Sequence, residues 1–293
     1  MRTMGKWRLA IPLIALAALV PAGCGGGAGS DTAATGGAGD VSQPTLDRIK
    51  ENGEIVIGVK YDVPPFGFKN PSTGEVEGFD VELGRAIAED LGVEPKFVEA
   101  ISDNRIPFLQ DGTVDLILST MTITGERDQE IDFSEPYYIA NGRILVPKGS
   151  DIAGIDDLAG KRVCTVLGST YADTLAEQAP DADLQLVDTY SECLELIQDG
   201  SVDAVSTDDV ILTGMVIQDD SLQLVGEDLT TEPYGAGLRD GDTAFKKAVD
   251  KSIDAYKKDG RWEASYEKWV GQYTGVKQKP PTMTLKEAIE LNP

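Results

Sequence analysis

Short apolar runs alternate along this chain with amphipathic stretches that end in glycine. The runs are rich in β-branched residues and continuous enough to predict buried parallel strands, at residues 54–61, 94–100 and 114–119. The stretches between them have helical spacing and glycine at the C′ position, which predicts helices at residues 78–92 and 104–112. Strand and helix therefore alternate in a βαβαβ order, which is typical of an α/β fold with an open sheet.

The same order occurs a second time. LQDGTVDLILST, residues 109–120, is repeated as IQDGSVDAVSTD, residues 197–208, at an offset of 88. Around the second copy the pattern predicts strands and helices at residues 161–167, 169–178, 184–188, 190–200 and 202–207. We therefore expect two α/β lobes. Open parallel sheets bind ligands at the carboxyl ends of their strands, so Thr120 and Asp208, which follow equivalent strands, are expected to face one cleft.

The N-terminus has the pattern of an export signal. MRTMGKWR is basic, an apolar run too short to span a bilayer follows, and the small residues of PAGC lead to Cys24. We expect a signal peptide at residues 1–23 and a lipid on Cys24. An ordinary cleaved signal with an incidental cysteine is the alternative. The Gly-rich and polar segment 24–44 predicts a flexible tether after the lipid anchor.

The two remaining cysteines suit an exported protein. Cys164 falls on a predicted strand and Cys193 on a predicted helix of the second lobe, 29 residues apart. In an oxidising compartment they form an even pair, and we expect a disulfide; two buried free thiols are the alternative. Two thiols in a chain without histidine are a poor ligand set, so we expect no metal.

Charge narrows the possible ligands. The formal net charge is −24, and loss of Arg2, Lys6 and Arg8 with residues 1–23 takes it to −27. Nucleic acid and anionic membrane surfaces are thus poor partners. Cations at or beyond the carboxyl ends of predicted strands are then informative, and three are so placed: Lys60, Arg105 and Arg127. A cluster of cations in a cleft indicates an anionic ligand group, although any one of them alone is better interpreted as a surface ion pair.

The motifs NRIPFLQDGTVDLILSTMTITGERDQEIDFSEPYY, GFDVELGRAIAEDLG, VLGST and AVSTDD resemble those of family 3 solute-binding proteins, the receptors of ABC importers for polar amino acids. The likeness is greatest to glutamate- and glutamine-binding lipoproteins of Gram-positive bacteria. It implies a periplasmic-binding-protein-like type II fold, whose two α/β lobes are joined by a two-segment hinge. The lobes are expected at residues 45–142 and 143–236, with residues 237–293 returning to the first lobe. It also implies a monomer that hands its ligand to an importer permease on the extracellular face of the membrane, without cofactor or catalysis.

The resemblance assigns roles to individual residues. Arg127 matches the arginine that holds the ligand α-carboxylate, and Asp208 matches the aspartate that binds the α-ammonium. Arg105 matches the arginine that faces a side-chain carboxylate in acidic-amino-acid binders. The remaining matches on the carboxylate side are Thr120, Thr122, Ser169 and Thr170. The charges alone support this picture, because a zwitterion needs one fixed anion and one fixed cation.

The residue at position 60 indicates which amino acid is preferred. The resemblance places aspartate there in glutamine-selective relatives and arginine in an aspartate/glutamate binder, so lysine favours glutamate, then aspartate, over glutamine and asparagine. Phe66 is a candidate for an aromatic wall, and core packing is its equal alternative. Tyr190 matches a position that sometimes lines the pocket, and it is alternatively a helix-cap neighbour. The paired cysteines also occur in these relatives.

The lobes are expected to connect near residues 141–143 and 233–237, where Gly and Pro fit a hinge or ordinary loops equally well. Residues 250–273 predict two helices that return to the first lobe, with Trp262, Tyr266 and Trp269 in the core.

Two rival functions remain. A dehydratase shares this fold, but no histidine and no second suitably placed carboxylate is present for catalysis. A sensor would act through a separate signalling partner.

Overall fold

The computed structural model describes residues 44–293. The expected signal peptide, Cys24 and the tether as far as residue 43 lie outside the described residues. Among residues 44–293, no helix combines the length and the apolar character that crossing a bilayer requires.

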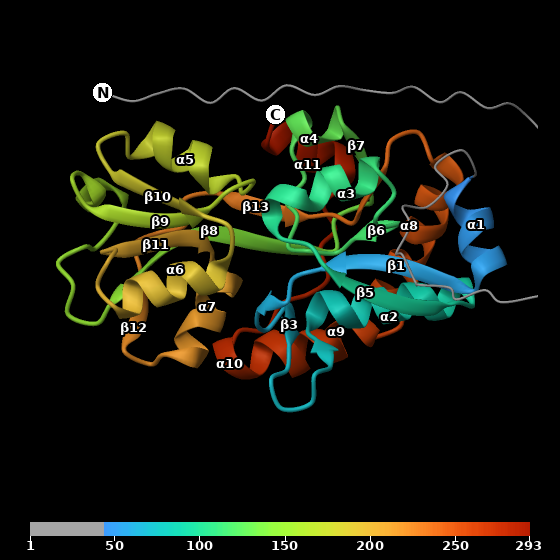
Figure 1. Cartoon of the computed structure of the whole chain (residues 1–293), viewed down its shortest axis with the longest axis horizontal. Helices are drawn as coiled ribbons and strands as arrows, with labels where there is room; N and C mark the ends of the chain where they lie inside the picture. Colours follow the sequence, from blue (N-terminus) through green and yellow to red (C-terminus); the bar gives the residue numbers. More distant parts are fainter. Residues whose placement is uncertain (1–43) are drawn as a thin grey trace, which may run out of the picture. The chain divides into compact units, whose positions relative to one another are not determined.

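The first lobe, lobe 1, is built on a five-stranded sheet in the order β5-β1-β6-β14-β7 (Figure 1). The strands are β1 Glu54–Val59, β5 Glu94–Glu99, β6 Leu116–Ile117, β7 Ile131–Phe133 and β14 Gly237–Arg239. β1 runs parallel to both neighbours, and its Ile57 pairs with Phe97 on one side and Leu116 on the other. α2 Phe79–Leu91 and α3 Arg105–Gln110 connect these three strands. The predicted βαβαβ order is confirmed.

Lobe 2 repeats this arrangement in the order β10-β9-β11-β8-β12, with β13 paired to β8. Its strands are β8 Tyr138–Pro147, β9 Arg162–Val166, β10 Asp183–Val187, β11 Ala204–Asp208, β12 Leu222–Val225 and β13 Thr231–Tyr234. α5 Tyr171–Gln178 and α6 Tyr190–Gln198 connect its parallel strands. In both copies of the repeat the helix ends just before a glycine with positive φ, Gly112 at 77° and Gly200 at 78°. The repeated QDG therefore ends a helix, as expected.

The remaining elements cover the sheets or connect the lobes. The helices are α1 Thr45–Asn52, α4 Gly125–Asp128, α7 Asp209–Gln218, α8 Thr243–Lys258, α9 Arg261–Tyr266, α10 Gln272–Thr274 and α11 Leu285–Leu291. Short 3-10 turns lie at Ser102–Asn104 and Ile155–Leu158, and a π-helical turn at Glu267–Gly271. A small sheet contains β2 Asp62–Val63, β3 Gly67–Lys69 and β4 Val76–Glu77. α8 and α9 pack on α2, so the tail returns to lobe 1 as predicted.

Two paired strands lie where the chain passes between the lobes. β8 and β13 are antiparallel, with Tyr138 opposite Tyr234 and Asn141 opposite Thr231, and β8 extends from this pair into the lobe 2 sheet (Figure 1). The predicted crossover at residues 141–143 thus falls inside a continuous strand. Gly142 serves close packing there, because a Cβ atom would lie 2.4 Å from Thr230 Oγ1. The second predicted segment, residues 233–237, joins β13 to β14.

An aromatic cluster fills the junction between the tail and the crossing strands. Phe66 lies with its ring centroid 4.9 Å from Tyr138 and 5.3 Å from Phe79, and Trp262 stacks on Tyr266 at 5.2 Å. Trp262 and Tyr266 are buried, and Trp269 packs against the same core, as the sequence indicated. Edge-to-face and stacked rings of this kind add stability beyond the buried area.

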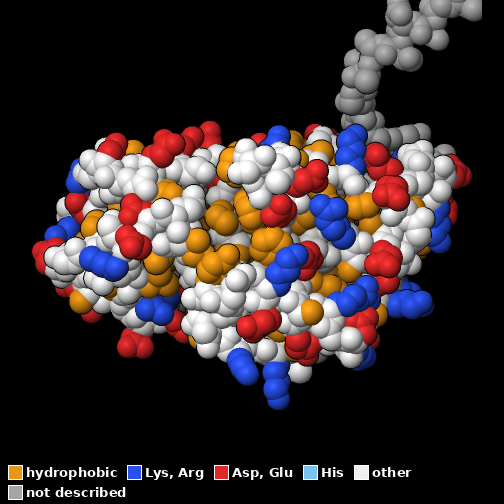
Figure 2. Space-filling view, turned by 90° about the horizontal axis from the view of Figure 1, so that it is seen from below, with side chains coloured by type: hydrophobic (Ala, Val, Ile, Leu, Met, Phe, Trp, Pro, Cys, Tyr) orange, Lys and Arg blue, Asp and Glu red, His pale blue; other side chains and the backbone are white. Residues whose placement is uncertain are grey.

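The acidic residues are spread over the surface. On the face that Figure 2 shows, Asp and Glu side chains are interspersed with Lys and Arg, and apolar side chains gather near the middle. This distribution agrees with a solvated, solubilising role for most of the negative charge.

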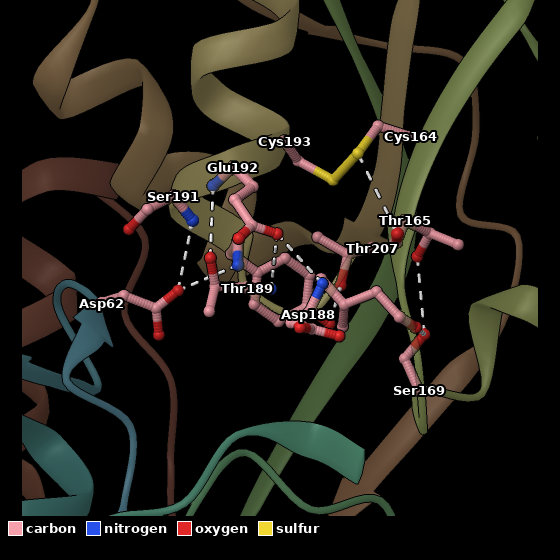
Figure 3. The surroundings of a disulfide bond; sticks show 12 residues. Asp62, Cys164, Thr165, Ser169, Asp188, Thr189, Ser191, Glu192, Cys193 and Thr207 are labelled. Atoms are coloured by element: carbon pink, nitrogen blue, oxygen red, sulfur yellow. Dashed lines mark hydrogen bonds between the residues drawn. A yellow bond between two sulfur atoms is a disulfide. The ribbon is translucent and has the colours of Figure 1, made fainter. Parts of the chain in front are cut away.

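The predicted disulfide is present. Cys164 on β9 is bonded to Cys193 on α6, and their Cα atoms are 5.6 Å apart (Figure 3). The bond fixes the first turns of α6 to the central parallel strand of lobe 2.

We expect the double variant Cys164→Ser/Cys193→Ser to lower the free energy of unfolding by about 3 to 4 kcal/mol, because the unfolded chain regains the freedom of a 29-residue loop. Urea unfolding of the soluble form that begins after Cys24 measures this change. Wild-type protein in reductant is the control and should match the double variant. Equal unfolding midpoints for the oxidised wild type and the variant would contradict the prediction.

Candidate functional site

Ten residues from both lobes line a small cavity between them. Lobe 1 contributes Ser102, Arg105, Thr120, Thr122 and Arg127, and lobe 2 contributes Ser169, Thr170, Tyr171, Tyr190 and Asp208. Eight of the ten predicted ligand-binding residues are among them. Thr120 follows β6, Asp208 ends the equivalent strand β11, and both face the same cavity, as the repeat indicated.

Arg105 is held by four hydrogen bonds to backbone carbonyls. Its Nε donates to Ser102 O at 3.0 Å, its Nη1 donates to Ser119 O and Thr120 O, and its Nη2 donates to Gly168 O of lobe 2 at 2.9 Å. Burial, and then Arg127, lower the pKa of Arg105 to about 9, so it stays protonated at neutral pH. A guanidinium has five N–H groups, which leaves Arg105 one donor for a ligand.

Arg127 has more donors available. Its Nη1 donates to Thr122 O at 2.7 Å and its Nη2 to Gly168 O at 2.9 Å, so three of its five N–H groups remain. Thr124 caps the short helix α4 that carries it by accepting from the Arg127 amide at 3.2 Å. Arg127 can therefore still form the paired hydrogen bonds with which guanidinium groups bind carboxylates.

The backbone at Thr120 is strained. Among the described residues, Thr120 is the one residue other than glycine with positive φ, at 44°. Such a conformation is costly for a β-branched residue and is typical of functional sites. Its amide donates to Asp80 Oδ2 at 2.9 Å, and Asp80 Oδ1 accepts from the Tyr137 hydroxyl at 2.8 Å. Burial raises the pKa of Asp80 to about 7 against the lowering effect of these two hydrogen bonds.

Asp208 supplies a buried carboxylate on the lobe 2 side. Its Oδ1 accepts from the Tyr171 hydroxyl at 2.9 Å. Burial, and then the nearby Glu232, raise the pKa of Asp208 well above its usual range. A cationic ligand group beside Asp208 would offset this cost and favour the ionised form.

The two predicted hydroxyl ligands of lobe 2 are already engaged. Ser169 Oγ donates to Val166 O at 2.7 Å, and Thr170 Oγ1 donates to Glu232 Oε2 at 3.1 Å. Each hydroxyl has one proton to donate, so neither can also donate to a ligand in this arrangement. Both side chains shape the cavity wall through their contacts within the protein.

Lys60 lies directly behind the cavity wall. Its Nζ donates to Ser102 Oγ at 2.7 Å and lies 5.6 Å from the centre of the Tyr190 ring. Burial, and then the positive charge of Arg105, lower the pKa of Lys60 well below its ordinary value, while Asp62 raises it. Within residues 44–293, no ion pair involves Lys60, Arg105 or Arg127. These charges are therefore not neutralised by direct acidic partners.

Tyr190 and Phe66 take different places. Tyr190 lines the cavity, and its hydroxyl accepts from Thr207 Oγ1 at 2.8 Å. Phe66 is completely buried among the aromatic rings of the core and does not line the cavity. Of the two interpretations of Phe66 that the sequence left open, the structure supports core packing.

Four residues of this site are absent from the sequence-based prediction: Ser102, Tyr171, Asp80 and Glu232. Ser102 and Tyr171 are uncharged, so neither was marked by the search for charged residues after strand ends, although Ser102 lies just past β5. Asp80 does leave a signal, because it occupies a buried position between Phe79 and Val81 on α2, where a carboxylate is unusual. Within the described chain, no group of three or more Cys, Asp or Glu side chains is arranged to hold a metal ion.

Comparison with known proteins agrees with this geometry. Bacterial extracellular solute-binding proteins, family 3, match residues 55–272. The ABC transporter glutamine-binding protein GlnH of Bacillus subtilis is 41% identical over 264 residues, which is 89% of this chain and 96% of the relative. The glutamine-binding protein of Geobacillus stearothermophilus is 42% identical over 66% of this chain and 75% of its own.

A solved structure has the same fold. An ancestral arginine-binding protein bound to glutamine superposes with a TM-score of 0.72 and 39% identity, over 75% of this chain and 98% of that one. Two α/β lobes that enclose a charged cavity, together with the match over residues 55–272, place this chain among the bacterial extracellular solute-binding proteins of family 3.

Proposed function

We propose that this protein is an extracellular receptor that binds a polar amino acid and delivers it to an ABC importer. The observation that carries the proposal is the pair of opposite charges in the cavity, Arg127 from lobe 1 and Asp208 from lobe 2. Arg127 has donors left for an α-carboxylate, and Asp208 can receive an α-ammonium. A zwitterion bound between them would contact both lobes.

We further propose glutamine as the preferred ligand, in place of the glutamate that Lys60 indicated from the sequence. The names of the two similar relatives support glutamine. So does the chemistry of the site. Arg105 has one donor left and cannot pair with a side-chain carboxylate through two hydrogen bonds. The lowered pKa of Lys60 makes a positive charge less favourable there, which supports an uncharged carboxamide over a carboxylate as the nearby ligand group.

Glutamate is the second candidate, and aspartate follows it. Lys60, Arg105 and Arg127 concentrate positive charge near the cavity, and a ligand carboxylate would raise the pKa of Lys60 by stabilising its protonated form. Binding of glutamate would then take up a proton.

Closure of the lobes supplies the mechanism. Arg105 and Arg127 of lobe 1 both donate to Gly168 O of lobe 2, which links the lobes beside the cavity. A ligand that contacts both lobes binds the closed arrangement more tightly than an open one and shifts the population toward it. The paired strands β8 and β13 are the expected hinge.

The N-terminal pattern completes the proposal. A signal peptide at residues 1–23, a lipid on Cys24 and a tether over residues 24–44 would hold the receptor at the extracellular face of the membrane. The permease of the importer is the proposed partner. The function is binding, without catalysis; a dehydratase of the same fold and a receptor for a separate signalling protein are the alternatives.

Calorimetric titration of the refolded, ligand-free soluble form tests the ligand. We expect glutamine to bind with a Kd of about 1 μM or lower, because several charge-assisted hydrogen bonds form in a closed cavity. Glutamate, aspartate, asparagine, histidine and arginine serve as comparisons. Absence of heat with every amino acid would refute the receptor assignment, and tightest binding of glutamate would refute the choice of glutamine.

The pH dependence tests the role of Lys60. Protonated Lys60 favours a ligand carboxylate, and its lowered pKa means that protonation increases as pH falls. We therefore expect the ratio of the Kd for glutamate to the Kd for glutamine to decrease as the pH falls, within the range in which free glutamate stays ionised. Calorimetry in matched buffers measures both constants. Lys60→Met should abolish the trend, and Lys60→Asp should weaken glutamate more than glutamine.

A matched pair of charge-conserving variants separates the two arginines. Arg105→Lys should lower the free energy of unfolding by about 2 to 3 kcal/mol, because several buried carbonyls lose their donor. Arg127→Lys should leave stability nearly unchanged but weaken glutamine about tenfold or more, because paired hydrogen bonds to a carboxylate need the planar guanidinium. Urea unfolding and calorimetry measure the two effects. The opposite assignment of effects would show that Arg105, and not Arg127, holds the ligand.

A further inference from the structure

Asp62 of lobe 1 reaches across to a helix of lobe 2. It begins β2, two residues after Lys60, and its Oδ2 accepts from the amides of Tyr190 at 2.9 Å and Ser191 at 3.2 Å. These are the first two amides of α6, and Figure 3 shows Asp62 facing the start of that helix. An anion at a helix N-terminus is favoured by the unpaired amides and by the helix dipole.

The helix α6 already has a cap of its own. Thr189 accepts from the Glu192 amide through its side chain, and the Glu192 carboxylate accepts from the Thr189 amide, which makes a complete capping box within lobe 2. Asp62 is therefore a second acceptor, supplied by the opposite lobe, for two amides that the box does not use. Lobe 2 does not need Asp62 to form α6.

The disulfide fixes the position of α6 on the side of lobe 2. Cys193 ties its first turns to β9 through the disulfide, so the two amides point in a set direction. Tyr190, whose amide Asp62 accepts from, lines the cavity and covers the Nζ of Lys60 with its ring. The contact of Asp62 thus holds the amide of Tyr190, a residue that lines the cavity and packs against Lys60.

The turn that follows Asp62 also fits closely against lobe 2. A Cβ atom on Gly214 of α7 would lie 1.6 Å from the carbonyl oxygen of Pro64. Residues 62–64 therefore meet lobe 2 at two places, on α6 and on α7. Both contacts require the lobes to be together.

We propose that Asp62 is an interlobe positioning residue, whose carboxylate holds α6 in the closed arrangement, slows opening and keeps Tyr190 over Lys60. The effect on ligand binding rests on the proposed function, whereas the effect on the lobes does not. Asp62 is half-buried, so solvent partly screens the contact. Loss of the contact should therefore raise the ligand dissociation rate koff by only about tenfold.

The test compares Asp62→Ala with Thr189→Ala in the soluble form. Both changes remove a cap of α6, but only the first removes one that crosses between the lobes. Stopped-flow kinetics with glutamine give koff, thermal unfolding gives the stability without ligand, and spin labels on Lys96→Cys and Glu177→Cys give the distance between the lobes. Asp62→Glu serves as the conservative rescue.

We expect Asp62→Ala to raise koff about tenfold and to shift the spin-label distances toward longer values, with the unfolding temperature without ligand nearly unchanged. Thr189→Ala should lower that temperature and leave koff unchanged. Equal koff and equal distances for Asp62→Ala and wild type would overturn the proposal, as would a loss of stability equal to that of Thr189→Ala. If no amino acid binds the wild type, the proposed function fails, and the distances still decide the role of Asp62.

Discussion

The carbonyl oxygen of Gly168 is the point on which the closed arrangement depends. It accepts from Arg105 and from Arg127, both at 2.9 Å, and so draws two guanidinium groups of lobe 1 to one atom of lobe 2. The position has to be glycine: its φ is 70°, and a Cβ atom would lie 2.5 Å from the Cα of Asp103. The orientation of both arginines, and with it the charge pattern of the cavity, follows from this approach.

Much of the fold could be predicted from the sequence because the same order of strands and helices occurs in both lobes. The repeated QDG and the apolar run after it predict the helix end, the parallel strand and the loop that carries Thr120 or Asp208, since each depends on neighbours in the chain. The charged residues at strand ends could also be identified, because their position depends only on the strand that precedes them in the chain.

The partners of these residues were not predictable. The four carbonyls that Arg105 binds come from three separate segments, and only the packed lobes bring them together. Asp80 and Glu232 act on the site from within the core, where sequence patterns show only burial.

The electrostatics of the site differ from those of the surface. A chain with a net charge of −24 keeps Lys60, Arg105 and Arg127 close together inside, without an ion pair to any of them among the described residues. Burial lowers the pKa of each of these cations and raises that of Asp80 and Asp208. Burial thus reduces the stability of the charged form of each of these groups relative to water. A zwitterionic ligand would supply the opposite charges that stabilise them.

The glycines at the lobe interface also determine how closely the two lobes can approach each other. Backbone atoms of lobe 1 approach Gly168 and Gly214 so closely that neither position has room for a methyl group. The gap between the lobes therefore has one closed width, fixed by contacts between main chains, which do not yield as side chains do. If the protein binds an amino acid as proposed, a side chain too long for this width would not be met by a slightly wider closed form. It would hold the lobes apart and lose the contacts of both, so discrimination by length would come from the backbone of the receptor as well as from the residues that touch the ligand.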